Sequence, residues 1–95
     1  MPNGEICNKG QWVAVLYGRK ASVGKVVDIP AKDSAKVHFL KGKKMAKNDV
    51  QDVHNKFLVC RVDVNHDSER EEIVLTEQSS EKIKRETSLY IEKYM

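Results

Sequence analysis

Residues 11–17 read QWVAVLY, and this apolar, β-branched run decides how the rest of the chain is interpreted. Four further short apolar runs follow it, separated by residues that favour turns. They span residues 22–29, 35–40, 49–53 and 57–62. Short β-branched runs at regular spacing are typical of a small antiparallel β-barrel or sandwich. The sequence therefore predicts a mainly β domain of five antiparallel strands.

Glycines and alternating side chains predict how these strands turn and pack. Gly18 directly follows the first run and marks a tight turn. Gly24 lies inside the second run, where glycine indicates a bend, a bulge or a close backbone approach. In the third run, apolar side chains alternate with polar ones, so we expect one face to point into the core. That face carries Ala35, Val37 and Phe39.

The chain changes character after its β-rich part, which we assign to residues 10–64. Residues 65–76 are polar and predict a linker with a short extended segment. Residues 77–94 predict an amphipathic C-terminal α-helix, because apolar side chains recur along it at helical spacing. This stripe consists of Ile83, Tyr90, Ile91 and Tyr94. Its covering surface is either the flank of the chain's own β domain or a partner, and both alternatives stay open.

Charge is distributed unevenly along the 95 residues, whose net charge is +3. Residues 1–62 hold twelve Lys and Arg against five Asp and Glu, a net charge of +7. Residues 63–95 hold five Lys and Arg against nine Asp and Glu, a net charge of −4. A basic domain of this kind favours anionic partners such as nucleic acid, unless the acidic tail itself covers the basic surface.

The basic residues gather at two predicted turns. Two follow the first strand, and four lysines surround Gly42 in residues 41–47. Alternate loops of a small β domain cluster at one end, so both groups are expected to form one basic end that contacts phosphates. The predicted nucleic-acid-binding residues are Arg19, Lys20, Lys41, Lys43, Lys44 and Lys47. The alternative is a solvated lysine loop that protects an edge strand against aggregation.

Catalysis, cofactor binding and metal binding find no support in the sequence. No Ser/His/Asp or Cys/His arrangement and no glycine-rich phosphate loop can be identified, so we expect neither an enzyme nor a cofactor. His38, His54 and His66 do not have the spacing of a structural zinc site.

Cysteine usage and hydropathy indicate an intracellular protein. Cys7 and Cys60 are too few for a disulfide scaffold, and we expect both to be reduced. No apolar run approaches the roughly 20 residues that cross a membrane. Residues 1–5 do not resemble a signal peptide.

Three segments carry a resemblance to a known family: residues 12–17 (WVAVLY), 24–29 (GKVVDI) and 36–40 (KVHFL). Together with residues 49–62 they resemble a Tudor-type, SH3-like β-barrel. The resemblance implies a five-stranded antiparallel barrel, here followed by the C-terminal α-helix. It also implies a nuclear, chromatin-type binding module, whose ligands are methylated lysine or arginine side chains held in an aromatic cage.

Two positions match the aromatic cage of that family. Tyr17 matches the ring at the end of the first strand, and Phe39 matches the ring at the end of the third. No ring stands near Ser22 or in the lysine loop, so the cage is incomplete. Trp12 is the third candidate for peptide binding, although a lone Trp at a strand start more often packs in the core or at its rim.

The sequence thus predicts a non-enzymatic binding module with three alternative partners. The first is DNA, RNA or a chromatin surface, contacted through the basic end. The second is a methylated protein tail, bound by the aromatic residues. The third is a protein partner or a second copy of the chain, docked on the helical stripe. None of these functions involves a membrane.

Overall fold

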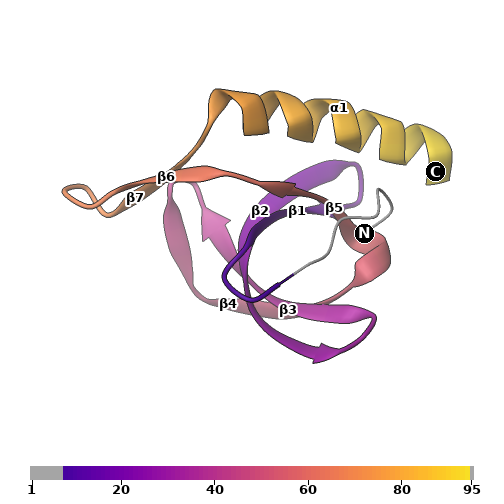
Figure 1. The fold of residues 1–95 in the computed structure, drawn as a ribbon, viewed down its shortest axis with the longest axis horizontal. Helices are drawn as coiled ribbons and strands as arrows, with labels where there is room; N and C mark the ends of the chain where they lie inside the picture. Colours follow the sequence, from indigo (N-terminus) through magenta and orange to yellow (C-terminus); the bar gives the residue numbers. More distant parts are fainter. Residues whose placement is uncertain (1–7, 95) are drawn as a thin grey trace.

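A curled antiparallel β-sheet with one helix lying across it forms the fold (Figure 1). The computed structural model describes residues 8–94. Five strands build the main sheet, a short 3₁₀ helix joins its last two strands, and a two-stranded hairpin precedes the C-terminal helix. In chain order the elements are β1 (Trp12–Tyr17), β2 (Lys20–Ala31), β3 (Ser34–Lys41), β4 (Lys44–His54), η1 (Asn55–Phe57), β5 (Leu58–Val62), β6 (Val64–Asp67), β7 (Glu72–Leu75) and α1 (Glu77–Tyr94).

The main sheet is open, so the predicted five-stranded barrel is wrong. Its strands are hydrogen-bonded in the order β4-β3-β2-β1-β5, and the edge strands β4 and β5 do not pair with each other within residues 8–94. After β4 the chain enters η1, and β5 then pairs with the outer edge of β1. That pairing ends at Val15 opposite Leu58, before β1 itself ends. The sheet therefore curls without closing, while the mainly β character and the C-terminal helix agree with the sequence.

The close backbone approach predicted for the second strand is present at Gly24. A Cβ atom at this position would lie 2.4 Å from Val37 Cγ1 and 2.9 Å from the His38 carbonyl oxygen. Only glycine therefore lets β2 pack this closely on β3. The concave face of the sheet holds the first core, which includes the predicted face of the third run. Its buried residues are Val13, Val15, Val26, Ala35, Val37, Phe39, Val53 and Leu58.

The opposite face of β1 and β5 is covered by α1, which lies across it in Figure 1. This second core consists of Ala14, Leu16, Val59, Cys60 and Val62. Ile83, Tyr90 and Ile91 of the helix pack against it. Because both faces of β1 are covered, residues 13–16 are each at most 6% exposed. No helix within residues 8–94 is long and apolar enough to cross a membrane.

Two hydroxyl side chains fix the start of α1. The Thr76 hydroxyl accepts a hydrogen bond of 3.2 Å from the Ser79 amide. Amides in the first turn of a helix have no main-chain acceptor within the helix, and the hydroxyl supplies one. The Ser79 hydroxyl is buried and accepts a hydrogen bond of 2.7 Å from the Asp63 amide. The helix is thus anchored to the chain that follows β5.

The segment predicted as a linker, residues 65–76, largely forms an antiparallel hairpin of β6 and β7. Glu71 has a φ of 53° in its turn. The hairpin projects from the sheet at the left of Figure 1. A hydrogen bond of 2.6 Å from the Ile73 amide to the Lys43 carbonyl oxygen joins it to the β3–β4 turn.

The predicted lysine loop is a tight β-hairpin. β3 ends at Lys41 and β4 begins at Lys44, and only Gly42 and Lys43 lie between them. Gly42 has a φ of 68°, a conformation that glycine adopts without steric cost. Most of the lysines predicted to lie in a loop are therefore strand residues.

Candidate ligand-binding cleft

A mainly apolar cleft lies where the curled sheet does not close, between the end of β1 and the C-terminal half of β4. It has a volume of about 410 Å³. Residues 15–18 line one side, residues 51–54 line the other, and Phe57 of η1 completes the lining. The end of β1 therefore meets two consecutive elements from much later in the chain, β4 and η1, at one concave site.

Tyr17 is held in a defined position at the end of β1. Its ring meets the ring of Phe39 edge-on, with centroids 5.6 Å apart and an interplanar angle of 62°. Its hydroxyl donates a hydrogen bond to Gln51 Oε1, and Gln51 Nε2 donates one of 3.0 Å to Asp49. Tyr17 as a residue is 44% exposed, so it is not enclosed in the core and can meet a ligand.

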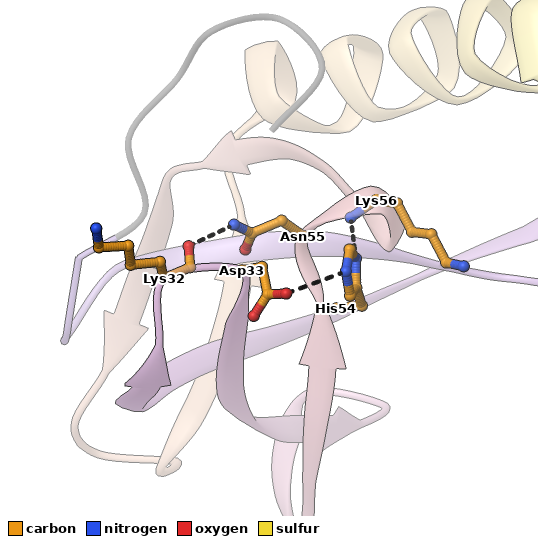
Figure 2. A network of polar contacts seen from close by, with 5 residues as sticks. All are labelled: Lys32, Asp33, His54, Asn55 and Lys56. Carbon is orange, nitrogen blue, oxygen red and sulfur yellow. Dashed lines mark hydrogen bonds and ion pairs between the residues drawn. The ribbon is translucent and has the colours of Figure 1, made fainter.

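Phe57 is the second half-exposed ring of the cleft, with 42% of the residue exposed. Its position depends on η1, which Figure 2 shows tied to the β2–β3 turn. The Asn55 side chain donates a hydrogen bond of 3.0 Å to the Lys32 carbonyl oxygen, and the Asn55 amide donates one of 2.7 Å to the Asp33 carbonyl oxygen. Two anchors therefore hold the short helix that presents Phe57.

His54 links the same two segments through both nitrogens of its ring (Figure 2). Nδ1 accepts a hydrogen bond of 3.1 Å from the Lys56 amide and so caps η1. Nε2 lies 3.6 Å from a carboxylate oxygen of Asp33. Because Nδ1 acts as an acceptor, this arrangement fits a neutral ring whose proton is on Nε2 and points toward Asp33.

Charged residues of both signs lie at or beside the cleft: Asp52 belongs to the lining, and Arg19, Lys20 and Lys56 each follow or precede a lining residue closely in the chain. Asp52 is the only carboxylate among the lining residues, and no lysine or arginine of the described chain belongs to the lining. Just outside it, the Lys56 ammonium lies 5.1 Å from the centroid of the Phe57 ring. The protein's own ammonium thus already uses one of these rings as a cation-binding surface.

The structure places the three aromatic residues that the sequence proposes for peptide binding in three different environments. Tyr17 and Phe39 are in contact, but Phe39 is only 3% exposed and supports Tyr17 from the core. Trp12 is half-buried against the second core, on the face of β1 that α1 covers. Phe57 is not predicted as a site residue, because it begins an apolar run and resembles a core residue. The only sequence signal for its exposure is the turn-forming segment that precedes it.

The six predicted basic residues are all exposed but belong to two turns with different neighbours. Arg19 and Lys20 follow Gly18, which lines the cleft beside residues 51–54. The lysines of the β3–β4 hairpin lie at the start of β4, and the main chain of Lys43 contacts β7 instead. The hairpin of β6 and β7, which this contact joins to the lysine turn, carries four acidic residues.

The helical stripe faces the protein's own sheet. Ile83, Tyr90 and Ile91 pack on the second core, which corresponds to the intramolecular alternative left open by the sequence. α1 ends at Tyr94, whose side chain lies outside the part of the chain that the structure describes. Leu89 is the large apolar residue that the helix leaves exposed, at 53%.

The cysteines and histidines form no second site in the described chain. Cys60 is a buried free thiol of the second core, and Cys7 lies outside the described residues. Within residues 8–94, no three His, Cys, Asp or Glu side chains are arranged to hold a metal ion.

Comparisons of the chain with family models, with curated proteins and with solved structures find no match. The chemistry of the cleft therefore has to be inferred from its own residues. They include two half-exposed rings in a mainly apolar lining, surfaces on which a side chain that is both apolar and positively charged can pack.

Proposed function

We propose that the protein is a non-enzymatic binding module whose cleft takes a methylated lysine or arginine side chain of a partner protein. One observation carries the proposal: Tyr17 and Phe57, both half-exposed, line one mainly apolar cleft. The face of each ring is attractive to a cation. A function of this kind is consistent with a nuclear protein.

Methylation matches the ligand to this cleft. A methylated ammonium or guanidinium keeps its charge but is less strongly hydrated, so it loses less free energy on entering an apolar cleft. A cation over a ring face contributes about 0.5–2 kcal/mol, with the larger values at desolvated sites.

Fluorescence anisotropy with labelled peptides tests the proposal. The peptides carry one unmodified, monomethylated, dimethylated or trimethylated lysine, or one methylated arginine, in a fixed neutral sequence. We expect a methylated peptide to bind more tightly than the unmodified one. Phe57→Ala should weaken this binding by about tenfold, corresponding to roughly 1.4 kcal/mol.

Val27→Ala is the matched control, because Val27 is 41% exposed on β2 and does not line the cleft. This variant should bind like the natural chain. Equal binding of all peptides, or equal losses in the cleft and control variants, would refute the proposed function.

Nucleic-acid binding is the second candidate, because Arg19, Lys20, Lys41, Lys43, Lys44 and Lys47 are all exposed. Contacts from such residues to phosphates release counterions, so binding should fall steeply between about 50 and 200 mM salt. Lys43→Glu combined with Lys44→Glu should abolish binding of labelled DNA and RNA, whereas Lys84→Glu on α1 should have little effect. Salt-independent binding, or none, excludes this candidate.

A further inference from the structure

The lining of the cleft indicates that main chain, as well as side chains, faces a ligand. Four consecutive residues of β1 and four consecutive residues of β4 contribute to it. Successive side chains of a strand point to opposite faces. If only side chains lined the cleft, every second residue of each strand would belong to the lining. Unbroken stretches, residues 15–18 and 51–54, are expected when the edge of each strand faces the cleft.

Both of these edges lack a β-sheet partner within residues 8–94. β4 pairs with β3 alone and is an edge of the main sheet. β1 pairs with β5 only as far as Val15, so Leu16 and Tyr17 pair only with β2. In an antiparallel pair, every second residue of an edge strand directs its amide and carbonyl groups outward. Unsatisfied groups of this kind are a template for an additional strand.

The C-terminal half of β4 is regular enough to serve as such a template. Residues 50–54 pair one to one with residues 38–34 of β3, whereas the register shifts closer to the start of β4. Asn48, in the shifted part, has a φ of 63°. Five regular residues span roughly 17 Å, which matches a peptide segment of about five residues.

We propose that the partner binds as an extended peptide that adds a β-strand to the open edge of residues 50–54, with its methylated side chain in the cleft. The inference rests on the proposed function and adds how the main chain of the partner is recognised. The two half-exposed rings favour a cationic side chain at the centre of the peptide. Exposed Val50, at 41%, offers an apolar contact at one end of the same edge.

Backbone N-methylation tests the inference. The probe is a capped seven-residue peptide of alanine, threonine and valine with trimethyllysine at its centre. Four analogues each carry one N-methyl group, at four successive residues around the trimethyllysine. N-methylation removes one amide donor, and an added strand uses the donors of alternate residues only. We therefore expect two alternate analogues to bind at least about tenfold more weakly, and the other two to bind like the parent.

Two outcomes separate the inference from the function on which it rests. If the parent peptide binds but the four analogues show no alternation, side-chain recognition stands and strand addition is overturned. If neither the parent nor the isolated amino acid acetyl-trimethyllysine methylamide binds, the proposed function fails and the inference fails with it. Amide hydrogen exchange supplies a second readout. Bound peptide should slow exchange at alternate residues of 50–54, and unchanged exchange there would also overturn strand addition.

Discussion

The Lys56 ammonium lies 5.1 Å from the centroid of the Phe57 ring, at the margin of the cleft. Lys56 is therefore expected to weaken the binding of an incoming cation in two ways. It competes for the ring, and its charge repels the ligand. The side chain is exposed, so it is free to move away when a ligand binds.

Replacement of Lys56 by Gln should consequently strengthen the binding of a methylated peptide, by about two- to fivefold for the loss of an exposed cation. Lys32→Gln is the matched control. Lys32 is also exposed, and it accepts the hydrogen bond from Asn55 through its main-chain carbonyl oxygen, which the substitution keeps. Anisotropy titrations of both variants measure the difference. Weaker binding by the Lys56 variant would show that the ammonium assists the ligand instead.

Asn55 should matter for binding although it does not line the cleft. Asn55→Ala removes the hydrogen bond from its side chain to the Lys32 carbonyl oxygen, one of the two anchors of η1. We expect weaker peptide binding, by a few fold, and a loss of about 0.5–1.5 kcal/mol in the free energy of unfolding. Asn65→Ala, at an exposed position of β6, is the control. Unchanged binding in the Asn55 variant would mean that η1 holds Phe57 without this anchor.

Gly24→Ala should destabilise the protein by about 1–3 kcal/mol, because the new methyl group would overlap Val37 and the His38 carbonyl oxygen. Urea unfolding measures the effect. Lys25→Ala changes the neighbouring, exposed residue of the same strand and should cost less than about 1 kcal/mol. Equal losses in both variants would contradict the close packing of β2 on β3.

The helix should be part of the folded unit and not a detachable partner site. Ile83→Ala removes a half-buried contact to the second core and should cost about 1–3 kcal/mol, below the range for fully buried positions. Leu89→Ala, at the exposed position of the same helix, should have little effect. A chain truncated after Asp67 should fail to fold, since the second core would lose its cover. Cooperative unfolding of the truncated chain would contradict this account.

Acid should remove a small stabilising contribution from Asp28. The Ile29 amide and the Lys9 ammonium hold the pKa of its carboxyl below the usual value. A pKa that is lowered on folding stabilises the folded protein above the unfolded-state pKa, and this contribution is lost as the pH falls through the folded-state pKa. Asp28→Asn should therefore lower the midpoint temperature at neutral pH, and this difference should shrink as the pH falls below the unfolded-state pKa. A difference that stays the same in acid would assign the effect to something other than the charge.

Local patterns were sufficient for most strands of the main sheet, but not for the first half of β4, for the hairpin of β6 and β7, or for how the sheet ends. Alternation predicted the buried face of Ala35, Val37 and Phe39, and the position of Gly24 predicted the close approach of two strands. Closure of a barrel depends on whether two distant edges meet, and no local pattern encodes that. The pairing of β5 with β1 stops at Val15, and this one long-range register leaves the sheet open.

The cleft illustrates the same limit. Tyr17 was predicted from its place at the end of a strand beside a glycine. Phe57 was not, because a ring at the start of an apolar run resembles a core residue until η1 is seen to turn it outward. The basic turns were predicted to lie together, but the first adjoins the cleft, whereas the second contacts β7 through its main chain.

The most direct test of the central claim is to titrate the ¹⁵N-labelled protein with acetyl-trimethyllysine methylamide and follow the amide chemical shifts. This ligand contains only the side chain and one residue of main chain, so it probes the cleft itself. Saturable shifts at Gly18, Asp52 and Phe57, with Val27 and Leu89 unchanged, are the predicted result. No saturable shift, or shifts confined to residues 41–47, would contradict the account.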